Sequence, residues 1–239
     1  MDLPDPANLS LEEMVKHIYV TVNKIDAKQT AQEARIVKLE SDVTVLKQQV
    51  HSLKNIVNRR EQESRGLSVR ISGFPYTDEE KGSTDSKYLA KKLHERVIQP
   101  LLNQAKLKNY IDRVPALDKT ISSCHRLRTN SPTGTASPPP IILKFVSDQV
   151  RLAALRCKRQ HMPAPSPSER DQGILKFSMA EDLTPSTFAK LKELSREECI
   201  IKSWTINGRI KFMIRDDTRI HTVRSVFDDV PDIISKAQS

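Results

Sequence analysis

The sequence predicts an α+β protein with a long N-terminal coiled-coil helix, a βαββαβ domain and a small C-terminal α/β hairpin domain. Three observations support this fold class. A heptad pattern without proline or glycine covers residues 11–60, strand-like alternation begins at Leu67, and Asn207-Gly208 marks a hairpin. The expected segments are a disordered N-terminus (1–10), the coiled-coil helix (11–64), the βαββαβ domain (66–178), the hairpin domain (179–229) and a tail (230–239).

The coiled-coil prediction depends on the side chains that repeat every seven residues. The a positions hold Val15, Val22, Gln29, Ile36, Val43, Val50 and Val57. The d positions hold Ile18, Ile25, Gln32, Leu39, Leu46, Leu53 and Arg60. Such a sustained apolar repeat is typical of helices that associate with other helices. The residues expected to form the oligomer interface are Arg35, Ile36, Leu39, Glu40, Val43, Leu46, Val50, Leu53 and Val57.

The number of chains in the oligomer can be argued in two ways. β-Branched residues at a with leucine at d are typical of dimers. The segment RIVKLE (35–40) instead resembles a motif of trimeric coiled coils, in which Arg35 covers the core edge and reaches Glu40 of a neighbouring chain. Opposite charges at other g and e positions favour a parallel bundle. We expect a homotrimer rather than a dimer, and a helix packed on its own domain is the remaining alternative.

The segment after the helix alternates between strand and helix patterns. Strands are expected at 67–75, 120–128, 141–147 and 173–178, and helices at 83–102 and 148–160. This order is the ferredoxin-like arrangement that RNA-recognition domains use to present a sheet to single strands. Typical RNA-recognition sheets stack bases on aromatics in the first and third strands. Here those strands offer only Phe74 at an exit and Phe145 at a core position, so we expect electrostatic contacts to dominate.

Basic residues are concentrated between Lys119 and His161. This segment contains eight lysines and arginines but a single acid, Asp148, and such an excess of positive charge is typical of a phosphate-binding surface. Some of these cations are expected only to solvate a helix, and those that close the second helix also suit its dipole. The candidates for nucleic-acid contact in this segment are His125, Arg126, Arg128, Arg151, Arg156, Lys158 and Arg159, of which Arg126 and Arg128 at a strand end are preferred.

The C-terminal segment predicts a helix and a hairpin. Thr184 is a good N-cap, and Pro185 suits the first helical position. A two-residue turn at Asn207-Gly208 pairs Trp204 with Lys211 and leaves an opposite, apolar face of Cys199, Ile201, Ile210, Phe212 and Ile214. A third strand is expected within TRIHTV (218–223).

The polar face of the hairpin combines an aromatic side chain with cations. Stacking together with phosphate charge is what a single-strand surface requires. The candidate residues are Lys202, Trp204, Arg209, Lys211 and Arg215. The alternative is that Trp204 packs beneath the helix expected at 185–198.

Arginines surround the change from helix to strand. The candidates there are Arg59, Arg60, Arg65 and Arg70. Arg60 occupies a d position, where an arginine disrupts a buried layer, so we expect the helices to splay there. Residues 61–66 would then act as a hinge, and arginines from every chain would form one multivalent basic site.

Neither a catalytic site nor a membrane segment is expected. The histidines show no metal-ligand spacing, and neither a glycine-rich phosphate loop nor a serine elbow is present. No apolar run approaches the roughly 20 residues of a membrane span, and MDLPDPANLSLEE does not resemble a signal peptide. The three cysteines suit a reducing compartment. A net charge of +9 and a pI of about 9.5 favour nucleic acid as the partner.

Several segments resemble one protein family when they are taken in order. RREQESRGLSVRISGFP (59–75), ISSCHRLR (121–128) and PPIILKFVSDQVRLAALRCKR (139–159) resemble parts of the first-open-reading-frame protein of LINE-type (non-LTR) retrotransposons. ILKFSMAEDLTPSTFAKLKEL (174–194) and IKSWTINGRIKFMIRDD (201–217) are similar to a branch related to baculovirus few-polyhedra proteins. Ser64-Arg65-Gly66 departs from the Asn-Leu-Arg-type run of the family.

The resemblance implies a function. Members form homotrimers, bind single-stranded RNA cooperatively, act as nucleic-acid chaperones and occur in cytoplasmic ribonucleoprotein particles. The implied binding residues are Arg59, Arg60, Arg65, Arg126, Arg128, Arg151, Arg156 and the Trp204 hairpin. We therefore expect a non-enzymatic protein that has no cofactor and binds single-stranded RNA. DNA is the second ligand to consider, and the nucleus is the second location. The alternative is a coiled-coil scaffold that recruits protein partners.

Overall fold

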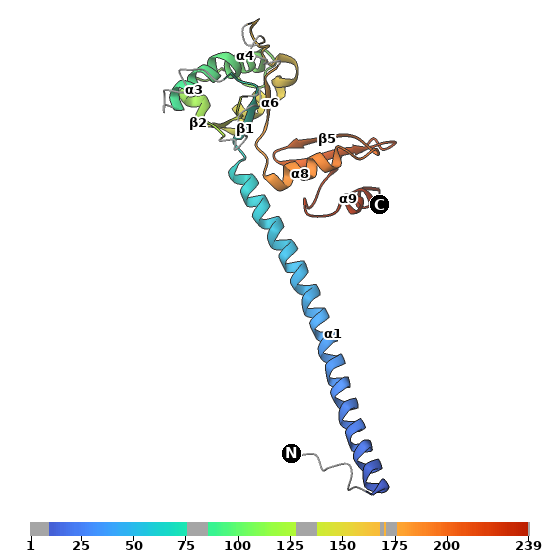
Figure 1. Ribbon diagram of the computed structural model, residues 1–239. Helices are drawn as coiled ribbons and strands as arrows, with labels where there is room; N and C mark the ends of the chain where they lie inside the picture. Colours follow the sequence, from blue (N-terminus) through green and yellow to red (C-terminus); the bar gives the residue numbers. More distant parts are fainter. Residues whose placement is uncertain (1–9, 76–85, 128–137, 168–169, 171–175, 239) are drawn as a thin grey trace. The chain divides into compact units, whose positions relative to one another are not determined.

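The computed structural model describes residues 10–75, 86–127, 138–167, 170 and 176–238 (Figure 1). The chain divides into two compact units, Met1–Lys54 and Asn55–Ser239. Helices occur together with antiparallel sheets, which confirms the predicted α+β class. Among the described residues, no helix has the length and apolarity that crossing a membrane requires.

Helix α1 (Leu11–Ser64) contains the whole heptad pattern. It begins with a capping box, in which the Ser10 hydroxyl and backbone N–H both donate to the Glu13 carboxylate, at 2.8 and 2.9 Å. These bonds lower the pKa of Glu13. No residue of α1 is buried. The apolar a and d side chains therefore form an exposed stripe, in which Leu39 is 53% and Leu46 is 57% exposed.

The second unit contains a first antiparallel sheet with strand order β2-β3-β1-β4. Its strands are β1 (Ser68–Ser72), β2 (Ile121–Arg126), β3 (Ile141–Phe145) and β4 (Ser178–Glu181). Between β1 and β2 lie α3 (Ser86–Leu93), η2 (His94–Ile98), α4 (Gln99–Leu107) and α5 (Leu117–Thr120), and α6 (Asp148–His161) follows β3. The described elements therefore succeed one another in the predicted βαββαβ order.

The helical run from Ser86 to Leu107 contains one π turn. At its end, the Gln99 N–H bonds to the His94 carbonyl five residues back. Pro100 follows at once and has no N–H to donate, so the regular ladder cannot continue through this point. The helices nevertheless bury an unbroken apolar side, which includes Leu93, Val97 and Leu101.

The predicted end of this domain is wrong. Strand β4 covers Ser178–Glu181, whereas the sequence pattern placed it at 173–178, of which 173–175 lie outside the described residues. Ser178 and Glu181 pair with Ser72 and Val69 of β1, so the domain boundary expected after residue 178 falls inside a strand. The apolar pattern was misleading because Phe177 is buried against Phe74 at the sheet end, with ring centroids 5.8 Å apart, rather than within a strand.

A second sheet has the order β5-β6-β7, with β5 (Ile200–Ile206), β6 (Arg209–Ile214) and β7 (His221–Thr222). The predicted hairpin register is confirmed, because Trp204 pairs with Lys211 and Ile206 with Arg209. Both turn residues adopt positive φ angles, 52° at Asn207 and 71° at Gly208, which Asn-Gly accepts readily.

The predicted apolar face of the hairpin needs one correction. The pairing shifts between Ile200 and Lys202, where a β-bulge inserts an extra residue. Ile200 therefore takes the buried position, and Ile201 is 63% exposed. A bulge shifts the alternation of sides along a strand, and the sequence pattern does not reveal it.

Two helices pack on the apolar face of this second sheet. Figure 1 shows one of them, α8, beside β5. Helix α8 (Pro185–Leu194) begins at the predicted N-cap, where the Thr187 N–H donates to the Thr184 hydroxyl at 3.2 Å. Helix α9 (Val230–Gln238) occupies the segment that was expected to be a tail. Its Val230 and Ile233 are buried in the same core as Ile210 and Phe212, so the tail prediction is wrong.

Candidate functional site

The β5–β6 hairpin separates an apolar face from a cationic one. Ile210, Phe212 and Ile214 are 1–2% exposed and pack with α8 and α9. Because side chains alternate along a strand, the residues between them lie on the opposite side. Cross-strand pairing adds residues of β5 to that side. We call this surface the C-terminal face, formed by Lys202, Trp204, Arg209 and Lys211.

Trp204 is partly exposed on the C-terminal face. Lys202 Nζ lies 5.2 Å from the centroid of its ring, and Lys211 is its cross-strand partner. Helix α8 packs on the other side of the sheet through Leu191 and Leu194. The alternative that Trp204 packs beneath this helix is therefore wrong. A ring among cations offers both base stacking and phosphate attraction.

Arg215 lies near the C-terminal face but is partly engaged. Its Nη2 donates to the Glu198 carbonyl at 3.0 Å, and its side chain is exposed. The guanidinium has five N–H donors, so this single bond leaves donors for a phosphate.

The first sheet has an open face on the side away from its helices. Pairing places His125, Ile142, Arg70 and Ala180 side by side across β2, β3, β1 and β4. Lys144, which is exposed, lies on the same side next to this row. We call this surface the N-terminal face, formed by Arg70, His125 and Lys144. Phe74 and Phe145 are 2% and 0% exposed, so neither offers a ring for stacking.

Lys144 was not among the candidate residues. The alternation of IILKF, with Ile141, Leu143 and Phe145 buried, puts Lys144 on the opposite side of β3. This signal was available in the sequence, because the period of a half-buried strand assigns a side to each residue.

Arg126 does not lie on the N-terminal face. It pairs with Ile141, on the side of the sheet that carries the core. Its guanidinium donates to the carbonyl oxygens of Phe74, at 3.1 Å, and of Pro139, at 2.9 Å, and also to that of Pro75. Arg126 therefore ties together chain segments at the sheet end. Arg128, the other preferred candidate at this strand end, lies outside the described residues.

Arg151 is buried, with a side chain only 3% exposed. It forms ion pairs with Asp148 at 2.7 Å and Glu181 at 3.3 Å, and its Nη2 donates to Asn207 Oδ1 at 2.7 Å. A guanidinium satisfied in this way has no free side for a phosphate. Arg151 was predicted to contact nucleic acid, and its ion pairs give it a different role in this structure, because a buried charge requires partners of its own.

The cations that end α6 divide into two kinds. Lys158 donates to the Met179 carbonyl at 2.7 Å, and burial lowers the pKa of its ammonium group. Lys158 thus links α6 to β4. Arg156 and Arg159 are exposed, and the Arg156 guanidinium lies 5.4 Å from the Tyr110 ring centroid. These two remain accessible, on the helical side of the first sheet.

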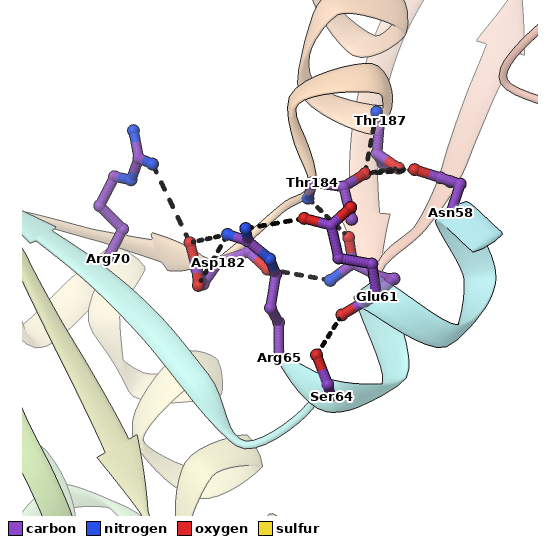
Figure 2. A network of polar contacts seen from close by, with 9 residues as sticks. Asn58, Glu61, Ser64, Arg65, Arg70, Asp182, Thr184 and Thr187 are labelled. Carbon is purple, nitrogen blue, oxygen red and sulfur yellow. Dashed lines mark hydrogen bonds and ion pairs between the residues drawn. The ribbon is translucent and has the colours of Figure 1, made fainter.

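The four arginines at the junction also have different surroundings. Arg65 pairs with Glu61 at 2.8 Å and with Asp182 at 3.3 Å, and Arg70 lies 4.0 Å from Asp182 (Figure 2). Arg59 is 71% exposed and lies 3.8 Å from Glu63. Arg60 is exposed and has no ion pair within the part of the chain that the structure describes. Arg59 and Arg60 are accordingly the exposed pair on α1, and Arg70 is 41% exposed on the N-terminal face.

The expected hinge at residues 61–66 is wrong. Helix α1 continues to Ser64, and Gln62 Nε2 donates to the Asp182 carbonyl at 2.9 Å. The Arg65 N–H continues the helical pattern with a bond to the Glu61 carbonyl at 3.2 Å. Arg60 interrupts the heptads, and such an interruption affects contacts between helices. The last turns of α1 are instead fixed by contacts of the same helix with its own domain.

Within the described ranges, no cluster of histidine, cysteine, aspartate and glutamate could hold a metal ion. No protein-family model and no curated protein matches this sequence.

Proposed function

We propose that this chain is a non-enzymatic, oligomeric protein that binds single-stranded RNA. The observation that carries the proposal is the C-terminal face, where Trp204 lies among Lys202, Arg209 and Lys211. Base–aromatic stacking contributes about 1–3 kcal/mol per base and is tolerant of sequence. Lysine and arginine around the ring add the phosphate contacts that track a flexible strand.

The N-terminal face supports the same proposal in a secondary role. The βαββαβ order and the strand order β2-β3-β1-β4 favour an RNA-recognition-like domain. Its open face offers Arg70, His125 and Lys144 but no exposed aromatic side chain among the described residues. We propose that this face attracts phosphates and that the C-terminal face supplies most of the stacking.

The apolar stripe of α1 supports self-association. A stripe that repeats a and d positions along a helix of 54 residues is stable in water only when other chains cover it. Arg35 and Glu40 form no ion pair within the described part of the chain, which leaves them available to a neighbouring helix. We propose a parallel homotrimer.

Oligomerisation would multiply the weak RNA contacts of each chain. Faces that bind weakly when they are separate bind one long strand far more tightly when they are linked, because the second contact becomes intramolecular. Coating of long RNA, and hence packaging into ribonucleoprotein particles and chaperone activity, follows from this multivalency. The resemblance to LINE-type first-open-reading-frame proteins points to a retrotransposon origin and to cytoplasmic particles.

The test is binding of labelled single-stranded RNA, single-stranded DNA and duplex RNA across a salt series, together with native mass measurement. We expect a trimer mass and preferential binding of single strands, with log K falling by about 0.7 per decade of salt for each phosphate contacted. Absence of RNA binding at low salt, together with an intact oligomer, would instead favour the scaffold function.

A further inference from the structure

The segment that connects the two sheets is bonded to the last turns of α1. This connector covers residues 181–184, from the end of β4 to the N-cap of α8. Gln62 bridges it with both ends of its amide, since Nε2 donates to the Asp182 carbonyl and Oε1 accepts the Thr184 N–H, each at 2.9 Å. The Gln62 amide thus bonds one backbone C=O and one backbone N–H of the connector, as a residue of a neighbouring β-strand would.

Asn58, one helical turn earlier, holds the start of α8. The Thr184 hydroxyl donates to Asn58 Oδ1 at 2.6 Å, and Asn58 Nδ2 donates to Thr187 Oγ1 at 3.3 Å (Figure 2). Thr184 and Thr187 are 0% and 1% exposed, so the threonine ends of these bonds are shielded from water. Asn58 and Gln62 are four residues apart and therefore lie on one side of α1.

The hairpin tip is attached to the same place. The Glu181 carboxylate accepts the backbone N–H groups of Asn207, at 2.7 Å, and Gly208, at 3.1 Å. A Cβ atom added to Gly208 would lie 2.3 Å from Gln62 Cγ, so the turn and Gln62 are in direct contact. Gln62 thus touches both the connector and the hairpin that carries the C-terminal face.

We infer that Asn58 and Gln62 are positioning residues for RNA binding, which hold the N-terminal and C-terminal faces in one fixed arrangement so that a single strand contacts both. This inference rests on the proposed function. Both side chains are neutral and already bonded within the protein, so we assign them a positioning role rather than direct phosphate contact. Fixing the two faces raises the effective concentration of the second face once the first has bound.

The test uses the full-length chain and two lengths of oligouridylate. A strand of about 6 nucleotides reaches one face, and a strand of about 20 nucleotides spans several. Asn58→Ala combined with Gln62→Ala should weaken binding of the longer strand about tenfold and leave binding of the short strand unchanged. Gln62→Ala alone is a milder variant that retains the Asn58 bonds. The matched control is Gln48→Ala, an exposed glutamine on α1 outside the a and d positions.

Three other outcomes would overturn the inference. Unchanged affinity for the longer strand in the double variant would show that the faces act independently, while the proposed function would stand. Equal weakening for both lengths would show that Asn58 and Gln62 only support folding of the C-terminal face. Failure of the unaltered protein to bind either strand would remove the proposed function together with the inference.

Discussion

Trp204 lies directly opposite Lys211 in the β5–β6 hairpin, on the side of the sheet that α8 and α9 leave uncovered. We expect Trp204→Ala to weaken binding of single-stranded RNA by about 1–3 kcal/mol, because the ring on which one base stacks is removed. Trp204→Phe should retain part of the affinity. Fluorescence anisotropy with labelled RNA measures both.

The control for Trp204 is Phe188→Ala. Phe188 is 46% exposed on α8 and carries Lys192 Nζ at 5.1 Å from its ring centroid, so it repeats the aromatic–cation pair on the other side of the sheet. Its removal should leave RNA affinity unchanged. An equal loss of affinity for Phe188→Ala and Trp204→Ala would argue against the C-terminal face as the binding surface.

Arg59 and Arg60 are the exposed arginines on α1 at the junction. Replacing both arginines with alanine should weaken RNA binding. The slope of log K against log salt concentration should become shallower by about 0.7 for each phosphate that the variant no longer binds. The oligomer mass should not change. A double replacement of Lys24 and Lys38 by alanine, both exposed earlier on α1, is the matched control. If affinity stays constant in both double variants, the junction arginines do not contact RNA.

Arg151 should matter for stability rather than for RNA contact. Arg151→Ala leaves the Glu181 carboxylate without its ion-pair partner in the described structure, and breaking such a buried pair costs about 3–5 kcal/mol. Urea unfolding measures this decrease in the free energy of unfolding. Arg159→Ala, an exposed change on the same helix, should stay within about 0.5 kcal/mol. Equal effects of the two changes would contradict the structural role of Arg151.

The oligomer should depend on one side of α1 only. Leu39 occupies a d position and is 53% exposed, whereas Val37 lies outside the stripe and is 66% exposed. Leu39→Asp should dissociate the proposed homotrimer, because three buried carboxylates would meet in one layer. Val37→Asp should leave the native mass unchanged. Dissociation by both variants, or by neither, would refute the heptad assignment.

Stability should fall at mildly acidic pH because of His94. The side chain is 7% exposed, its Nε2 has no hydrogen-bond partner among the described residues, and burial lowers its pKa. The unfolded chain therefore binds the proton more readily than the folded chain, so folding weakens as pH falls below the ordinary histidine pKa of about 6.5. The urea midpoint of His94→Leu should depend less on pH between about 7 and 5 than that of the unaltered protein.

Two features could be predicted well from sequence because local chemistry determines them. A heptad repeat specifies a helix with one apolar stripe, and α1 ends at the expected Ser64. A two-residue Asn-Gly turn sets the register of a hairpin, and Trp204 indeed pairs with Lys211. In both cases the decisive residues are neighbours in the chain.

The roles of individual arginines could not be predicted in the same way. Arg151 and Arg65 look as basic in the sequence as Arg159 and Arg60. Arg151 meets Glu181 thirty residues later, and Arg65 meets Asp182 117 residues later. The composition gives only the number of charged residues. Burial and ion pairing in the folded chain decide which of these residues remain accessible to a phosphate.

By itself, the sequence determined that this chain has a helix with an apolar stripe, two αβ modules and an excess of positive charge, because period, turn chemistry and composition are properties of short segments. Only the tertiary structure decided that residues 61–66 continue into a bonded junction rather than a hinge, and that Arg126 and Arg151 serve the fold. The physical reason is that Asn58 and Gln62 find their partners at Asp182, Thr184 and Thr187, more than a hundred residues away. Contacts at that separation exist only once both modules have folded.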